Sequence, residues 1–419
     1  MYQKTTLDNG LRIISSTMPH TRSVCIGIFL GAGSRYERAA ETGVSHFIEH
    51  LCFKGTERRA TSREISEAIE GVGGILNGGT DKELTVYWCK VARPHFSLAV
   101  DVLADMLCYS KFDPEDIEKE RQVITEEINM ILDSPQHRVD MLIDELRWPN
   151  QPLGRDVAGT KATVASLTRQ DIFHYLDSQY LANNAVVGVA GDINHDEVVD
   201  SLEKAFGSWQ KGVTQSWYPA DDKQYQPRWR VESRDTEQAH LCLAVPGLSL
   251  KHPDRFNLDL LSVVLGEGMS SRLFLEIREK RGLAYAIHSD VDHFLDTGSL
   301  VVYAGIDPKH FSTTVEAILE ELSRLKEGIP EAELVKAKEL SKGRLLLRME
   351  DTRTVAGWLG GQELLLDEIL SVDQVVSIID AIQSSDLLRV AQELLVGEKL
   401  NLAVVGPVED KQLEGLLQL

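Results

Sequence analysis

Two histidines and a glutamate between residues 46 and 50 have the types and spacing of a hydrolytic metal site. His46 and His50 stand at i and i+4, so in a helix their rings meet on one face and can share one ion. Glu49 can reach a metal-bound water without being a ligand, which is the division of labour that a metallopeptidase needs. Chance produces this pattern in roughly a few per cent of such chains. The alternative is a surface helix with two solvated histidines.

A catalytic zinc ion needs three protein ligands, and the predicted helix after Pro114 offers carboxylates for the third. The buried stripe of this helix is predicted to contain Ile117, Ile124, Ile128 and Ile131. Glu120 and Glu127 lie on the flank of that stripe, whereas Glu126 points to the opposite face. Two carboxylates on the core side are costly unless they are paired or bound to a cation. Either a metal ion or a basic group such as Arg121 must therefore compensate them.

Strand and helix patterns surround these candidate residues. A hairpin signal at residues 8–10 precedes an apolar strand at residues 24–30. Helical periodicity follows at residues 42–54, 62–70, 94–109 and 114–132, and strands are predicted at residues 74–80 and 84–91. The candidate metal residues are thus expected on two helices of one α+β domain.

The second half of the chain repeats this order of elements. Strands are predicted at residues 240–245, 283–291 and 299–304, and helices at residues 254–265, 270–280, 310–326 and 331–347. Both halves then close with an apolar strand that runs into a glycine, Gly191 in the first and Gly406 in the second. This self-similarity predicts a duplicated α+β unit, with domains at residues 1–212 and 230–419. A linker rich in proline and aromatic residues joins them at residues 213–229.

Composition restricts the class of protein. The chain has 419 residues and a net charge of −21, from 65 acidic and 44 basic residues, which argues against nucleic acid as a partner. The acidity either serves solubility or favours basic ligands. Five cysteines with no CxxC spacing favour a reducing compartment. No export signal or apolar run of 18 residues is present, so we expect a cytoplasmic protein without a membrane partner, although a removed targeting peptide would leave no trace.

Residues 43–56, which contain the inverted His-x-x-Glu-His motif, resemble the pitrilysin family of inverzincins. The resemblance covers the whole chain and is greatest to the bacterial relatives of the mitochondrial processing peptidase beta subunit. It implies one Zn2+ per chain, with the ligands His46, His50 and Glu127. By the same resemblance, Glu49 is the base that activates water, and Glu120 steadies the ligands as the first member of a Glu-x6-Glu pair.

Residues 73–80 resemble the edge strand on which the family binds an extended peptide by backbone hydrogen bonds. The resemblance assigns Asn77 an assisting role. Family members more often carry alanine and a bulkier residue where Gly78 and Gly79 stand, which implies a roomier pocket beside the scissile bond. An ordinary glycine bend is the other interpretation.

Arg278 and Tyr285 resemble the family's Arg/Tyr pair, whose donors bind peptide carbonyls and stabilise an oxyanion. Composition alone would make them a solvated helix residue and a strand aromatic. The loop at residues 266–269 corresponds to the glycine-rich loop of the processing peptidase's non-catalytic subunit, and is either a flap or a plain helix entry. It is not a phosphate loop, because no Gly-Lys-Ser/Thr follows and Glu267 would repel phosphate.

The resemblance also implies an assembly and an activity. The expected fold is α+β, with two homologous domains, each a mainly antiparallel sheet packed by helices, that form half of a clamshell chamber. We expect a homodimer in which Arg278 and Tyr285 serve the partner's zinc, or else a heterodimer with an inactive paralogue. The expected activity is zinc-dependent endoproteolysis of short or unfolded peptides. The alternative is a non-catalytic or partner-dependent subunit, a scaffold or peptide binder, but such members typically lose motif residues that are intact here.

Overall fold

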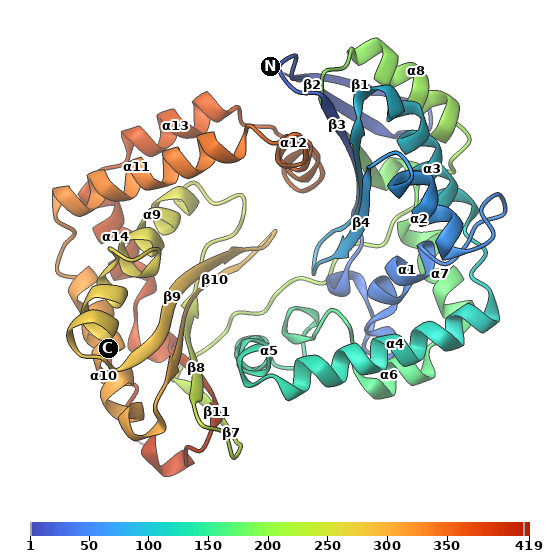
Figure 1. The fold of residues 1–419 in the computed structure, drawn as a ribbon. Coiled ribbons are helices and arrows are strands. Elements are labelled where there is room, and N and C mark those ends of the chain that lie inside the picture. The colour runs from blue at the N-terminus through green and yellow to red at the C-terminus, as the bar shows by residue number, and fades with distance from the viewer. Residues whose placement is uncertain (1, 414) are drawn as a thin grey trace. The chain divides into compact units, whose positions relative to one another are not determined.

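The structure is a computed structural model that describes residues 2–413 and 415–419. Its described part contains two β-sheets with helices packed on their faces, which confirms the predicted α+β fold with two homologous domains (Figure 1). The strands are β1 (Tyr2–Thr6), β2 (Arg12–Thr17), β3 (Ser23–Leu30), β4 (Ile75–Thr80), β5 (Thr85–Ala92), β6 (Ala185–Gly191), β7 (Arg228–Ser233), β8 (Ala239–Pro246), β9 (Ala284–His293), β10 (Gly298–Ile306) and β11 (Asn401–Gly406). The α-helices are α1 (Val44–Cys52), α2 (Ser62–Glu70), α3 (Phe96–Tyr109), α4 (Pro114–Asp133), α5 (Pro135–Arg147), α6 (Lys161–Ser166), α7 (Arg169–Gln179), α8 (His195–Phe206), α9 (Arg255–Gly266), α10 (Phe311–Leu325), α11 (Glu331–Arg348), α12 (Thr352–Leu366), α13 (Val372–Ala381) and α14 (Ser384–Leu394).

The first sheet has the strand order β1-β2-β6-β3-β5-β4. Strands β2 and β6 run parallel, and every other neighbouring pair is antiparallel. The hairpin predicted at residues 8–10 joins β1 to β2. Strand β4 ends the sheet, so one of its edges is free of strand partners within the described part of the chain.

The second sheet repeats this pairing. Its order is β7-β11-β8-β10-β9, in which β7 and β11 are parallel and the other neighbouring pairs are antiparallel. Strand for strand, this is the arrangement of β2-β6-β3-β5-β4 in the first sheet. The shared topology agrees with the duplication that the order of sequence patterns predicts.

The compact units draw their segments from both halves of the sequence. One unit begins with the segment that ends at Ile128 and adds Asp156–Tyr218 and Leu346–Ser371, and the other comprises Asn129–Arg155, Pro219–Leu345 and Val372–Leu419. As a result α12 packs on β2, β3 and β6, whereas α5 packs on β7, β8 and β11. Each sheet is therefore covered by a helix from the opposite half of the chain. The predicted domain boundaries at residues 1–212 and 230–419 stay a prediction.

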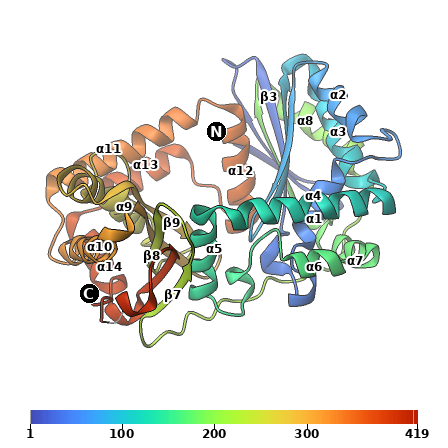
Figure 2. The same cartoon turned by 60° about the horizontal axis from the view of Figure 1, so that its bottom comes forward.

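Helices α5 and α12 are each packed against their sheet by apolar side chains. In the first unit, α12 lies on one face of the sheet while α3 and α8 lie on the other (Figure 1), and Leu359 of α12 is buried with Phe29 and Val186. In the second unit, α5 lies along the sheet (Figure 2), and Val139 and Leu142 are fully buried. Burial of such side chains contributes about 1.5–3 kcal/mol each, which makes α5 and α12 parts of the two cores.

Several predicted elements are confirmed and one differs in type. The helices expected at residues 42–54, 62–70 and 114–132 are α1, α2 and α4. The helix expected at residues 270–280 is instead a π-helix over Phe274–Lys280. Residues 213–227, most of the predicted linker, form no helix or strand, and Trp217 lies under the guanidinium of Arg35 at 4.4 Å. Among the described residues, no helix has both the length and the apolar character that crossing a bilayer requires.

Candidate metal centre

Helix α1 carries His46, Glu49 and His50, and its N-terminus is firmly anchored. The chain enters the helix through Gly43, whose φ of 97° is in the left-handed region that glycine adopts without strain. The buried carboxylate of Glu37 accepts the backbone N–H groups of Gly43 and Ser45 at 2.8 and 2.9 Å, which satisfies donors that the first turn leaves free. The apolar residues Phe47, Ile48 and Leu51 of α1 are fully buried or nearly so.

Helix α4 presents the carboxylates as its periodicity predicts. Ile117, Ile124 and Ile128 are buried and Ile131 is half-buried. Glu120 is also buried and Glu127 half-buried, whereas Glu126 is exposed. Arg121 donates to Glu118 at 3.0 Å and to the carbonyl of Leu167 at 2.9 Å, so its guanidinium is engaged away from both glutamates.

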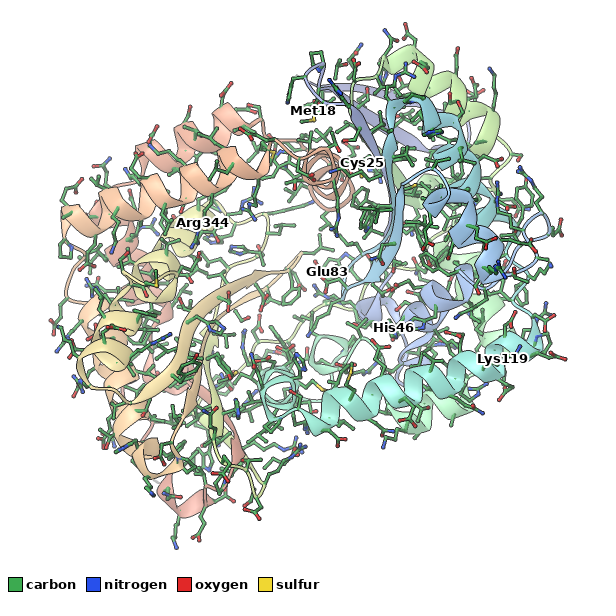
Figure 3. The ribbon with its side chains drawn as sticks, in the orientation of Figure 1. Met18, Cys25, His46, Glu83, Lys119 and Arg344 are labelled. Carbon is green, nitrogen blue, oxygen red and sulfur yellow. The ribbon has the colours of Figure 1, made fainter. Side chains whose placement is uncertain are left out.

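The structure brings His46, His50 and Glu127 together as a group with one ligand atom each, all within 4.8 Å of one another. The Oε2 atom of Glu127 lies 3.7 Å from His46 Nε2 and 3.6 Å from His50 Nε2. These separations are too long for hydrogen bonds, but a tetrahedral ion with bonds of about 2.1 Å separates its ligand atoms by about 3.4 Å. Figure 3 labels His46 on α1, beside α4. Two imidazoles and a carboxylate are a donor set that suits zinc.

Hydrogen bonds and burial set the protonation states around the group. Burial, and to a smaller extent the charge of His50, lowers the pKa of His46 to about 4, so its imidazole is neutral at pH 7. His50 donates from Nδ1 to Glu120 Oε2 at 3.1 Å, a tautomer that leaves the Nε2 lone pair directed to the group. Burial raises the pKa of Glu120, but hydrogen bonds from His50 and Lys54 outweigh it, so this pKa is lowered overall. Glu120 is therefore a carboxylate at neutral pH.

Glu49 faces β4 from α1. Its Oε2 accepts the hydroxyl of Thr80 at 2.7 Å, and burial raises its pKa above the ordinary value of a glutamate. Gly78 lies directly against it, because a Cβ there would stand 3.2 Å from Oε1 of Glu49, whereas a Cβ at Gly79 would meet nothing within 4 Å. Asn77 is exposed, and its Oδ1 accepts the N–H of Gly78 at 2.8 Å. The edge strand therefore adjoins Glu49 through Gly78 and Thr80.

Arg278 and Tyr285 lie together in the second compact unit. The guanidinium of Arg278, on the π-helix, is 5.1 Å from the centre of the Tyr285 ring and 4.8 Å from that of Phe274. Tyr285 is 75% exposed, so its hydroxyl is open to a ligand. In the loop at residues 266–269, Glu267 forms an ion pair with Arg344, which Figure 3 labels.

Sequence reasoning missed Thr80 and Lys54 as partners of the candidate residues. Thr80 stands two residues after Gly78, so strand alternation places both on the face that Glu49 meets. Lys54 stands four residues after His50 and donates to Glu120 Oε1 at 2.6 Å. Both spacings are visible in the sequence, but they acquire meaning only when β4 and α4 are placed beside α1.

Comparisons with protein families and with individual proteins point to one family along the chain. Residues 12–161 match the family described as "Insulinase (Peptidase family M16)", and residues 166–341 match "Peptidase M16 inactive domain". The chain is 37% identical over 409 residues to an uncharacterized zinc protease of Bacillus subtilis, covering 97% of this chain and 98% of that protein. It is 39% identical over 417 residues to an uncharacterized zinc protease of Streptomyces coelicolor, covering 98% and 90%.

Solved structures share the fold. A protease from Helicobacter pylori has a TM-score of 0.91 at 26% identity, with 97% of this chain and 99% of that chain covered. A chain of complex III2 from Candida albicans has a TM-score of 0.85 at 20% identity, with 100% of both chains covered. The same fold therefore occurs in a protease and in a chain of complex III2.

Proposed function

The chain belongs to the M16 family of peptidases, as the pitrilysin resemblance predicts, and on that premise we propose that it is a zinc-dependent metalloendopeptidase for short or unfolded peptides. The observation that carries the proposal is the convergence of His46, His50 and Glu127 within 4.8 Å. Glu49 adjoins this group on the same helix. A ligand set with a neighbouring base is what peptide hydrolysis requires.

In the proposed reaction, different residues of the chain have different roles. A zinc ion held by His46, His50 and Glu127 would supply Lewis acidity, which would polarise the scissile carbonyl and make water a stronger acid. Glu49 takes the proton of the attacking water and later gives it to the leaving amine, a role suited to a carboxylate whose pKa burial raises. The free edge of β4, with Asn77 exposed, binds the peptide backbone as an added strand.

Two further residues act on the substrate carbonyl. Arg278 and Tyr285 offer a guanidinium and a phenol from neighbouring positions, and both are hydrogen-bond donors. Donors aimed at a developing oxyanion lower the barrier most where water is excluded. The proposed assembly is a homodimer with one zinc per chain, in which this pair serves the partner's metal centre.

A non-catalytic subunit is the second candidate function. The match of residues 166–341 to a domain described as inactive favours it. Such a domain is nevertheless compatible with activity, because the candidate ligands and base all lie before residue 166, in the segment that matches the peptidase family. The metal group and Glu49 make the catalytic proposal the stronger one.

The proposal is tested with Glu49→Gln. We expect this variant to keep one zinc per chain but to lose cleavage of a quenched peptide by about 100-fold or more, because the proton acceptor is removed and the ligands stay. Zinc is measured by elemental analysis and cleavage by fluorescence, with and without a chelator. Glu126→Gln, an exposed carboxylate on the outer face of α4, is the matched control and should behave as wild type. Retained turnover in Glu49→Gln would refute the role of Glu49, and wild-type protein without zinc would refute the metal centre.

A further inference from the structure

Lys54 is a charged residue beside the metal centre to which the proposed reaction gives no role. It follows the C-terminus of α1 and places its ammonium 2.6 Å from Oε1 of Glu120. The other oxygen of Glu120 accepts the Nδ1–H of His50 at 3.1 Å. Lys54, Glu120 and His50 therefore form a continuous chain of hydrogen bonds that ends on a candidate ligand.

The backbone at Lys54 is held in place by the turn that follows α1. The N–H of Lys54 donates to the carbonyl of Leu51 at 3.1 Å, and Thr56 is fully buried with its hydroxyl 2.7 Å from Asp105. Between them Gly55 makes a close approach, because a Cβ there would lie 2.5 Å from the carbonyl oxygen of Ala60. The ammonium thus extends toward Glu120 from a fixed backbone position, so only the freedom of the Lys54 side chain is lost in forming the ion pair.

Glu120 depends on this cation because its carboxylate is 95% buried, with 5% of its side chain exposed. A buried carboxylate is tolerated when cations and donors satisfy its oxygens. His50 satisfies one oxygen and Lys54 the other. Without Lys54, Oε1 would lose its ammonium partner, and the carboxylate would be free to turn away from the His50 ring.

The two histidines differ in their need for such support. His46 Nδ1 is buried without a hydrogen-bond partner among the described residues, so packing alone orients that ring. His50 is more exposed, with 22% of its side chain accessible against 12% for His46, and its ring is oriented by Glu120. The more exposed ligand is therefore the one that hydrogen bonding must hold.

We propose that Lys54 is a positioning residue of the metal centre, which fixes the carboxylate of Glu120 so that Glu120 fixes the ring of His50. The inference rests on the proposed zinc function, and it adds an outer partner to the ligand set. Partners of this kind typically change metal affinity 10- to 100-fold when they are removed. Lys54 acts one bond further out than Glu120, so its removal should weaken zinc binding about tenfold.

The experiment measures the zinc dissociation constant by competition with a chromophoric chelator. We expect Lys54→Met to weaken zinc about tenfold and Lys54→Arg to stay within about threefold of wild type, because a guanidinium can also donate to Oε1. Lys119→Met is the matched control. Lys119 stands next to Glu120 in the sequence but is 68% exposed and pairs with Asp116, so its removal takes the same charge from the region without touching Glu120.

A double-mutant cycle separates positioning from a general charge effect. If Lys54 acts through Glu120, adding Lys54→Met to Glu120→Gln should weaken zinc by less than about twofold more. The visible spectrum of the Co2+-substituted protein should change in both single variants and not in Lys119→Met. Lys54→Gln takes the place of Lys54→Met if circular dichroism shows that the methionine variant is unfolded.

The outcomes separate this inference from the proposed function. Wild-type affinity in folded Lys54→Met or Lys54→Gln would overturn the inference, and so would fully additive losses with Glu120→Gln. An equal loss in Lys119→Met would overturn it as well, because charge alone would then be the cause. A wild-type protein that binds no zinc would instead refute the metal centre itself.

Discussion

At the scale of single residues, the two histidines of the candidate metal centre, His46 and His50, are made ready to bind an ion in different ways. His46 is kept neutral by burial, which lowers its pKa to about 4, and no proton has to leave it at neutral pH. His50 is prepared by its hydrogen bond to Glu120, which selects the tautomer with a free Nε2. Glu49 is held apart from the ligands by the hydroxyl of Thr80, so it stays available for proton transfer.

Glu37 couples the stability of the motif helix to pH. Burial raises its pKa to about 7, although hydrogen bonds from Ser45 and Gly43 lower it in part. Because the folded pKa exceeds the unfolded value of about 4.5, the protonated form favours folding. The stabilisation that Glu37 provides in this way is complete below about pH 4.5 and is lost as pH rises through about 7. The unfolding free energy changes by roughly 3 kcal/mol over this range.

Glu37→Gln should therefore remove a pH dependence. We expect the unfolding free energy of the variant, relative to wild type, to rise between pH 5 and pH 8 by up to about 3 kcal/mol, because glutamine does not ionise. Urea denaturation at several pH values measures this difference. If the two proteins lose stability in parallel over this range, Glu37 does not carry the effect.

At the scale of elements, local patterns predicted the helices that carry the candidate metal residues and missed those that cover a sheet from the opposite half of the chain. Helices α1 and α4 were predicted because their apolar residues and their candidate ligands follow helical periodicity. Helix α12 was missed, because Gly357, Gly360 and Gly361 weaken its helical pattern. Helix α5 has a readable apolar stripe, but no local pattern reveals that it covers a sheet from the other half. Likewise, the position of Lys54 four residues after His50 does not indicate its ion pair with Glu120 until the structure places α4 beside α1.

The glycines of α12 allow a close approach to the first sheet. A Cβ at Gly360 would lie 2.2 Å from ring atoms of Phe29, and one at Gly188 of β6 would lie 2.4 Å from the carbonyl oxygen of Ala356. Side chains are thus absent on both sides of this contact. At Gly361, one residue further along α12, a Cβ would meet nothing within 4 Å.

This contrast gives a matched pair of substitutions. Gly360→Ala should destabilise the protein by about 1–3 kcal/mol, because the added methyl forces α12 away from β3. Gly361→Ala should instead stabilise it by up to about 1 kcal/mol through helix propensity. Urea denaturation of both variants measures the difference. Equal stability of the two alanine variants would show that α12 does not pack on the sheet as described.

At the scale of the whole molecule, the two sets of candidate functional residues lie in different compact units. The metal group and Glu49 belong to the first compact unit, and Arg278 and Tyr285 belong to the second. Each unit also contains a helix from the other half of the sequence, so cutting the chain at residue 212 would remove α12 from the first sheet. Each unit is therefore built from both halves of the sequence. A site could be shared between two chains only by association of whole molecules.

The proposed homodimer predicts complementation between two inactive variants. His46→Ala should lose the metal centre, and Tyr285→Phe should lose about 100-fold in activity because an oxyanion donor is absent. In a mixed dimer, the intact metal centre of the Tyr285→Phe chain meets the intact Tyr285 of the other chain. Random exchange makes half of the dimers mixed, each with one working site of two, so about a quarter of wild-type activity should return. Mixing His46→Ala with Glu49→Gln is the control, since both changes lie on the metal side and no working site can form. Sedimentation tests whether the chain forms a dimer. A dimer that recovers no activity in the first mixture would mean that each chain completes its own site.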